Sequence, residues 1–222
     1  MTRVLLTGFG DWAGSRDNPA EAVAEALSGE TVAGAAVEHV IAPSVFKEMV
    51  PSVTARIDAV SPDVVIMMGE YGGRASLTVE RLAQNLIDAT RYGFGDETGD
   101  EPQDRPVVEG GPAAYYATLP IRAMVRAMRD AGVPADISDT AATFGCNLLM
   151  YGVLHHVATN GRPIRAGWVH LPSLPKTAAL EKNLGMPSMS LATQVEGVRA
   201  GIAAAVTHAE DIAEPIRSRW QL

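Results

Sequence analysis

The chain has 222 residues, 47% of them hydrophobic, and no charge block or low-complexity tract, so we expect one compact domain spanning residues 1–222. Its formal net charge of −8, with 18 scattered basic residues, argues against a nucleic-acid binder, since phosphate neutralisation needs clustered Lys and Arg. No apolar run approaches the roughly 20 residues of a membrane-spanning helix, and the N-terminal residues lack the features of a signal peptide. We therefore expect neither nucleic acid nor membrane as a partner.

The cysteine content bears on the compartment. Cys146 is the only cysteine in the sequence, so no disulfide can form within the chain. Unpaired cysteines persist in a reducing cytoplasm, whereas secreted domains tend to pair theirs. The sequence therefore favours a cytoplasmic protein.

The first third of the chain predicts alternating strands and helices. Arg3–Phe9 reads as a buried strand, and Asn18 is placed to cap a helix that has Pro19 at its first position. A strand is expected over Val37–Ala42, and a helix follows, because apolar residues then recur at helical spacing. The unbroken apolar run Val64–Met68 is typical of a central strand covered on both faces.

The same alternation continues to the C-terminal part. Between Thr90 and Gly111, Gly, Asp, Glu and Pro are crowded together, which indicates a long surface loop. Beyond it the patterns predict the helix Ile121–Met128, the strand Ala135–Asp139, the helix Leu148–Val157, the strand Gly167–Leu171 and the helix Leu191–Val206. This order predicts an α/β protein, a three-layer α/β/α fold with an open, mainly parallel twisted sheet, whose sites lie at the carboxyl ends of strands.

Two kinds of cofactor site are disfavoured. Gly8, Gly10 and Gly14 superficially resemble a dinucleotide-binding turn, but that fingerprint leads directly into a helix, whereas here a polar stretch separates the glycines from the cap at Asn18. No cluster of residues has the spacing of metal ligands. We therefore expect no cofactor and no metal.

Cys146 is the first candidate for chemistry. It lies between a predicted strand that ends near Asp139 and a helix that we expect to begin at Asn147. A thiol at a helix N-terminus feels the positive end of the backbone dipole, which lowers its pKa from about 8.5, and free amides there can hold an oxyanion. The alternative is that a lone cysteine is a small buried hydrophobe.

His170 and Glu80 are the other candidates. His170 ends an apolar strand and is followed by prolines, although a histidine in this position is commonly structural. Glu80 lies among the apolar residues Leu77 and Val79, where a buried carboxylate needs a cation or an imidazole as partner. Judged from its own segment, Glu80 reads slightly more readily as a surface residue. His155 and His156 lie inside a predicted helix and are interpreted as structural.

Five blocks of the sequence together resemble the pyroglutamyl-peptidase I family, also called pyrrolidone-carboxylate peptidase. They are TGF with Asn18-Pro19, GGRASLTVERLAQN, EGGPAAYYATLPIRAM, SDTAATFGCNLLMYG and WVHLPSLP, and they occur in the order of the family. The resemblance extends from about Arg3 to His208. Ordered blocks are far more specific than any one short motif.

The resemblance implies an activity and its residues. It implies metal-free hydrolysis that removes an N-terminal 5-oxoproline residue from a peptide, on an α/β fold that forms a homotetramer. It assigns Cys146 as nucleophile, His170 as general base and then acid, and Glu80 as the third member of the triad. It also places Phe9, Trp12, Phe144 and Asn18 around the lactam ring.

Departures from the family pattern cluster around the expected pocket. Trp12 replaces a usual phenylalanine, Glu70 stands where a neutral residue is common, Ala142 replaces a usual glycine and Gly145 a usual apolar residue. The family's Arg-Ile-Pro-Asp-Asn segment is replaced by TRYGFGDETG, in which Arg91 is the candidate for the missing arginine and for a partner of Glu70.

These departures keep two other functions open. The same triad could act on a different small cyclic amide or acylated amine, since pocket shape retunes substrate choice. A noncatalytic relative could instead bind pyroglutamyl ends or a partner protein. The intact set of Cys, His and Glu favours an enzyme.

Overall fold

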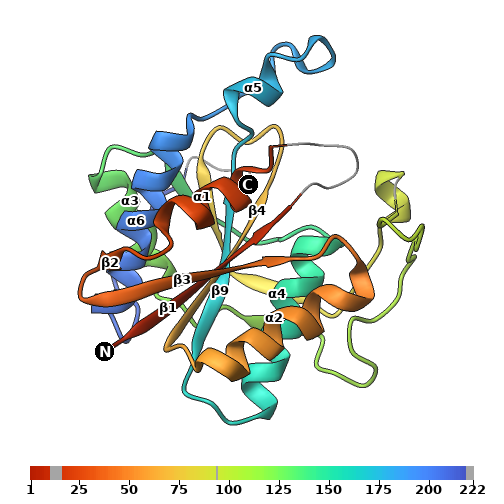
Figure 1. Cartoon of the computed structure of the whole chain (residues 1–222), viewed down its shortest axis with the longest axis horizontal. Helices are drawn as coiled ribbons and strands as arrows, with labels where there is room; N and C mark the ends of the chain where they lie inside the picture. The colour runs from red at the N-terminus through yellow and green to blue at the C-terminus, as the bar shows by residue number, and fades with distance from the viewer. Residues whose placement is uncertain (11–16, 94, 219–222) are drawn as a thin grey trace.

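The computed structural model describes residues 1–10, 17–93 and 95–218, and a seven-stranded sheet forms the centre of this part of the chain (Figure 1). The strands lie in the order β2-β3-β1-β4-β9-β5-β8. Their bounds are β1 Arg3–Phe9, β2 Thr31–Val32, β3 Ala35–Ala42, β4 Val64–Glu70, β5 Leu77–Glu80, β8 Ala135–Ser138 and β9 Arg165–Leu171. Neighbouring strands are parallel except at β2–β3 and β5–β9, so the sheet is mainly parallel, as predicted.

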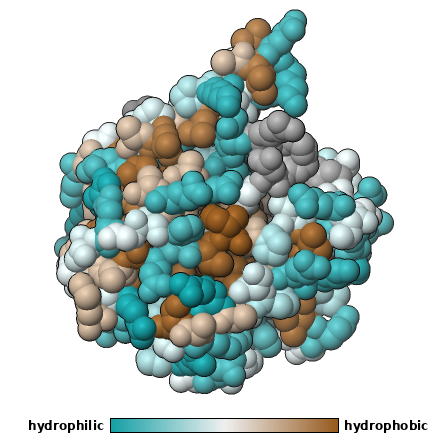
Figure 2. Space-filling model, viewed as in Figure 1, coloured by the Kyte–Doolittle hydropathy of each residue, from teal (hydrophilic) through white to brown (hydrophobic). Residues whose placement is uncertain are grey.

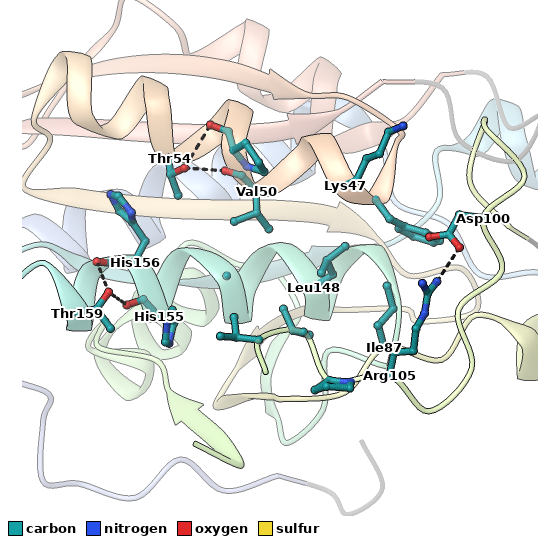
Figure 3. A pocket seen from close by; sticks show the side chains of 16 residues that line it. Lys47, Val50, Thr54, Ile87, Asp100, Arg105, Leu148, His155, His156 and Thr159 are labelled. Carbon is teal, nitrogen blue, oxygen red and sulfur yellow. Dashed lines mark hydrogen bonds and ion pairs between the residues drawn. The ribbon is translucent and has the colours of Figure 1, made fainter. Parts of the chain in front are cut away.

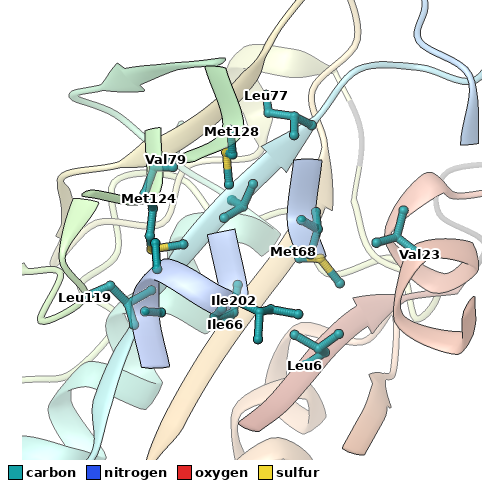
Figure 4. Close-up of a cluster of buried hydrophobic side chains, with 14 of the residues drawn as sticks. Leu6, Val23, Ile66, Met68, Leu77, Val79, Leu119, Met124, Met128 and Ile202 are labelled. Atoms are coloured by element: carbon teal, nitrogen blue, oxygen red, sulfur yellow. The ribbon is translucent and has the colours of Figure 1, made fainter. Parts of the chain in front are cut away.

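Helices cover both faces of this sheet. Three pack on one face, namely α1 (Pro19–Leu27), α3 (Ile121–Asp130) and α6 (Leu191–Thr207), and two on the other, namely α2 (Phe46–Val60) and α4 (Gly145–Thr159). Side chains alternate between the two cores along each strand, because successive strand residues point to opposite faces. In β4, for example, Ile66 and Met68 join the core under α6 (Figure 4), whereas Val65 and Met67 join the core under α4. The three-layer α/β/α fold is therefore confirmed.

Side-chain oxygens cap the N-terminal ends of α1 and α3. Asn18 accepts a hydrogen bond from the amide of Ala20 and precedes Pro19, which confirms the predicted start of α1. Helix α3 has no cap from its own flank; instead Asp211, in the segment after α6, accepts hydrogen bonds from the amides of Arg122 and Ala123. The segment after the last helix thus holds α3 in place.

Short elements outside the main sheet escaped prediction. β6 (Leu82–Gln84) and β7 (Ala114–Tyr116) form a separate two-stranded sheet. Between them, the described residues form the 3-10 turn η1 (Thr90–Tyr92) and a bridge from Ile87 to Arg105. After β9, α5 (Pro175–Ala178) and η2 (Glu181–Asn183) lie on a segment that projects from the body (Figures 1 and 2). None of the described helices has both the length and the apolar character of a membrane span.

The reversed strand β5 decides which residues meet. Because β5 runs antiparallel to β9, Thr78 pairs with His170, and Glu80 pairs with Trp168. Leu77 and Val79 join the core under α6, so the intervening Thr78 and Glu80 face the side of α4. His170 and Trp168 face the same side, which brings a carboxyl group, an imidazole and the start of α4 together.

Candidate active site

Glu80 and His170 form a buried pair. Nδ1 of His170 lies 2.7 Å from Oε1 of Glu80, and the side chains are 1% and 0% exposed, respectively. A carboxylate can only accept, so Nδ1 carries the proton of this bond, which leaves Nε2 as the acceptor of the ring. The surface position favoured for Glu80 from its segment alone is wrong, because its partners come from elsewhere in the chain.

Arg74 completes this buried group and was not predicted as a site residue. Its Nη1 donates to Oε1 of Glu80 at 2.8 Å and also to the hydroxyl of Thr78, while Nη2 donates to Ser138 Oγ at 3.3 Å. The guanidinium carbon lies 3.7 Å from the centre of the Tyr71 ring. The sequence could have indicated this residue, because a carboxylate among apolar residues, such as Glu80, requires a partner, and Arg74 lies six residues before it.

Cys146 is the second residue of α4, so the helix begins two residues earlier than predicted and includes the cysteine. The residue as a whole is partly exposed, and its thiol packs against the sheet at Gly69. A Cβ on Gly69 would lie 2.8 Å from Sγ of Cys146 and 2.7 Å from the ring of Trp168, distances that real Cβ atoms do not show. Glycine at position 69 therefore gives the thiol its place against β4.

The surroundings of both groups favour their neutral forms. Burial raises the pKa of the Cys146 thiol, the negative charge of Glu80 raises it further, and Arg74 acts in the opposite direction. Burial also lowers the pKa of His170, while the hydrogen bond that its Nδ1–H donates to Glu80 raises it. Backbone hydrogen bonding at Cys146 acts in the expected direction and lowers the thiol pKa, but desolvation by burial outweighs it, so the net shift in the free protein is upward.

Cys146 and His170 line the same cavity, of about 340 Å³. Its other walls are Glu70, Tyr71, Gly72, Tyr92, Ala142 and Phe144. The ring of Phe144 lies 4.9 Å from that of Tyr92, and the Tyr71 ring meets His170 edge to face at 5.2 Å. Tyr71 and Tyr92 were missed, since both come from turns without periodicity. A small pocket walled by aromatic rings, with a thiol, an imidazole and one carboxyl group in its lining, suits a compact ligand.

Three further residues expected around the pocket, Phe9, Asn18 and Gly145, lie within the described part of the chain. Phe9 is buried and packs on Trp168 at 5.8 Å, while Asn18 caps α1 and donates to the carbonyl of Gly10. Gly145 is the buried first residue of α4. Trp12 lies outside the described residues. Phe9, Asn18 and Gly145 do not belong to the cavity lining.

Arg91 and Glu70 do not pair in the described structure. Arg91 is exposed, with its guanidinium carbon 5.2 Å from the centre of the Tyr92 ring, and it does not line the cavity. Glu70 lines the cavity and instead accepts a hydrogen bond from the hydroxyl of Ser173. A carboxyl group thus remains in the cavity wall.

The backbone conformation at position 142 bears on one departure from the family pattern. Ala142 has φ 64°, in the left-handed region that glycine adopts without strain. The glycine that is usual here fits that geometry, and this chain instead places a methyl group in the cavity wall.

A larger groove of about 630 Å³ lies between α2, α4 and residues 105–108 (Figure 3). His155 and His156 line it, but both are engaged in structural contacts. Nδ1 of His155 lies 3.0 Å from the hydroxyl of Tyr115, and Nε2 of His156 lies 2.9 Å from Asp58. Nowhere among the described residues do three or more His, Cys, Asp or Glu side chains gather in a way that could hold a metal ion.

Comparisons with known proteins agree with this geometry. The model of the family Pyroglutamyl peptidase matches residues 2–208. Pyrrolidone-carboxylate peptidase of Mycobacterium marinum is 56% identical over 222 residues, 100% of both chains, and that of Mycobacterium tuberculosis is 55% identical over the same span.

Solved structures of lower identity share the fold. Pyrrolidone carboxyl peptidase from Thermococcus litoralis superposes with a TM-score of 0.92 at 32% identity, covering 97% of this chain and 100% of its own. Pyroglutamyl peptidase I of Bacillus amyloliquefaciens superposes with a TM-score of 0.90 at 34% identity, covering 96% and 100%. The full-length sequence match and the shared fold show that this chain belongs to the pyroglutamyl peptidase family of cysteine peptidases.

Proposed function

We propose that this chain removes an N-terminal pyroglutamyl (5-oxoproline) residue from peptides through a thioester acyl-enzyme. The carrying observation is that Cys146 and His170 line one cavity, while buried Glu80 holds the far nitrogen of the imidazole. Relatives named pyrrolidone-carboxylate peptidase, 55–56% identical over the full chain, support this substrate.

The geometry supports a stepwise mechanism. Nε2 of His170 accepts the thiol proton as Sγ of Cys146 attacks the pyroglutamyl carbonyl carbon, and the C=O electron pair moves onto oxygen. First-turn amides of α4 lack intrahelical acceptors and are the donors for this oxyanion. When the C–N bond breaks, His170 returns the proton to the leaving amine. A water then gives a proton to His170 and attacks the thioester, and 5-oxoproline leaves as the thiol regains that proton.

The roles of the flanking residues follow from their places. Glu80 orients His170 and stabilises the imidazolium that forms in each proton transfer. Phe144 forms a wall against the lactam ring, and Gly145 starts the helix turn that donates to the oxyanion. We retain Phe9, Trp12, Asn18 and Arg91 as substrate-binding residues, as the family resemblance implies.

The setting and assembly are part of the same proposal. A free cysteine nucleophile functions in a reducing compartment, which supports a cytoplasmic enzyme. A homotetramer, as the family resemblance implies, is supported by Leu180 and Leu184, which are 48% and 72% exposed on the projecting segment. One domain spanning residues 1–222 is supported by the single main sheet that unites distant parts of the chain.

The direct test is cleavage of a pyroglutamyl-coumarin amide. We expect release of the fluorophore with a kcat/KM at least about a hundredfold above that for the prolyl and glutamyl amides, which lack the lactam carbonyl or the ring. Labelling of Cys146 without turnover of any lactam amide would instead support a noncatalytic relative.

A second candidate, hydrolysis of another cyclic amide, rests on Glu70 in the cavity wall. A carboxylate beside a neutral lactam is unfavourable unless it accepts the ring N–H. Its charge also raises the pKa of the Cys146 thiol, which disfavours thiolate.

Glu70→Gln is therefore expected to raise kcat/KM on the pyroglutamyl amide by up to about tenfold, as for one pKa unit of charge interaction. The control is Glu109→Gln, which removes a charge from an exposed residue outside the cavity lining. Equal activity of parent and Glu70→Gln on the pyroglutamyl amide would show that Glu70 is a neutral replacement. A parent that prefers a different lactam amide, with the preference reversed in the variant, would favour the second candidate.

A further inference from the structure

Arg74 makes more contacts with the site than a structural ion pair needs. Its side chain is 9% exposed. Its guanidinium donates hydrogen bonds to the side chains of Glu80, Thr78 and Ser138. Nη1 and the imidazole Nδ1 both bond to the same oxygen of Glu80, at 2.8 Å and 2.7 Å. Oε2 of Glu80 is buried and has no partner among the described residues. The bonding of the carboxylate is thus concentrated on the atom that faces His170.

The Tyr71 ring links Arg74 to the cavity. It lies between the guanidinium, 3.7 Å from its centre, and the imidazole, which it meets edge to face. Tyr71 is itself a wall of the cavity. Arg74 therefore lies directly behind the wall that a substrate would touch, yet it does not line the cavity.

We propose that Arg74 is a positioning residue that fixes Glu80 on His170 and, by its charge, keeps the imidazole unprotonated and able to act as a base. This inference rests on the proposed roles of Glu80, His170 and Cys146.

Charge counting gives the physical reason. With Arg74, the buried set of Arg74, Glu80 and neutral His170 has no net charge, and a proton on His170 would make it positive. Without Arg74 the set is negative, and the same proton would neutralise it. Since a buried net charge is costly, loss of Arg74 favours protonated His170. The individual effects agree with this charge count, because the charge of Arg74 lowers the pKa of His170 and that of Cys146.

Other ionisable groups face the pair but do not replace Arg74. Cys146 and Tyr71 contribute a thiol and a phenol at the cavity, and Glu70 adds a further negative charge. Arg81 is the next arginine along the chain, but it pairs with exposed Asp139 at 2.5 Å. Arg81 therefore provides a matched control for removal of an arginine near Glu80.

The test compares pH profiles of kcat/KM for the parent, Arg74→Met, Arg74→Gln, Arg74→Lys and Arg81→Met. Both neutral variants at position 74 should move the acid limb upward by at least about one pH unit, so that activity falls about tenfold at acid pH and recovers as pH rises. Arg74→Lys keeps the charge but not the forked contacts, so its limb should stay near the parental pH while kcat falls. Arg81→Met should match the parent.

Arg74→Gln keeps a hydrogen-bond donor for Glu80, so it provides the neutral variant for the test if Arg74→Met does not fold. A loss of activity that is uniform across pH, with the acid limb unmoved in a folded neutral variant, would overturn the proposal in favour of a structural role. Alkylation of Cys146 by iodoacetamide, followed against pH, needs no peptidase activity. Its midpoint should also move upward in both neutral variants. If the parent cleaves no pyroglutamyl amide and this midpoint still moves, the proposed function fails and the role of Arg74 stands.

Discussion

Cys146→Ala is expected to abolish turnover of the pyroglutamyl amide, lowering kcat by roughly 10⁴-fold or more, because the covalent pathway loses its only nucleophile. Cys146→Ser should be almost as inactive, since an unactivated hydroxyl replaces the thiol at the same place. Both changes remove or exchange a single side-chain atom of a partly exposed residue, so the fold should persist.

Circular dichroism and thermal melting check the fold, and fluorophore release checks turnover. Since Cys146 is the only cysteine in the chain, loss of thiol labelling in both variants gives an internal control on identity. Retained turnover by folded Cys146→Ala would exclude the acyl-enzyme mechanism.

His170→Ala should lower kcat/KM by about 10³-fold or more, because it removes both the base and the acid of the mechanism. His155→Ala and His156→Ala are the matched controls, since these histidines make structural contacts with Tyr115 and Asp58. Both should retain near-parental activity. An inactive His156→Ala beside an active His170→Ala would show that the wrong histidine has been assigned.

The pH profile of the parent enzyme follows from the same pair. Burial lowers the pKa of His170, so the acid limb, where a proton on the imidazole removes the base, should lie below the ordinary value of about 6.5. Burial raises the pKa of Cys146, so the alkaline limb, where the pair loses the proton needed by the leaving amine, should lie above about 8.5. A broad plateau between the limbs is therefore expected. A narrow bell centred near pH 7 would contradict these surroundings.

Regular elements of the main fold could be predicted because they carry local patterns. A few adjacent residues are enough to indicate burial or a helix boundary. Examples are the apolar run Val64–Met68, the cap at Asn18 and the helical spacing over Ile121–Met128. The strands β2, β6 and β7 have two or three residues, too few to show a period. Their pairing is decided by partners that lie elsewhere in the sequence.

In the candidate site, too, local features could be predicted, whereas features that depend on distant residues could not. Local sequence placed Cys146 near a helix start and His170 at a strand end, and family resemblance selected Glu80. The burial of Glu80 could not be predicted from its segment, because the imidazole that bonds it lies 90 residues away and β5 is reversed beside β9. The net upward shift of the Cys146 pKa could not be predicted for a related reason, since desolvation depends on all the residues that enclose the thiol, whereas the backbone at the helix start is local.

The contact between Gly69 and Cys146 limits how this enzyme can evolve. Glycine is a weak strand former, and in a buried strand it usually marks a close approach of other atoms. Here any substituent at position 69 would collide with both the thiol and Trp168. Variant libraries built to change specificity should leave codon 69 fixed and diversify Glu70, Tyr71 and Tyr92, because a side chain at position 69 would raise strand propensity but displace the sulfur of the proposed nucleophile.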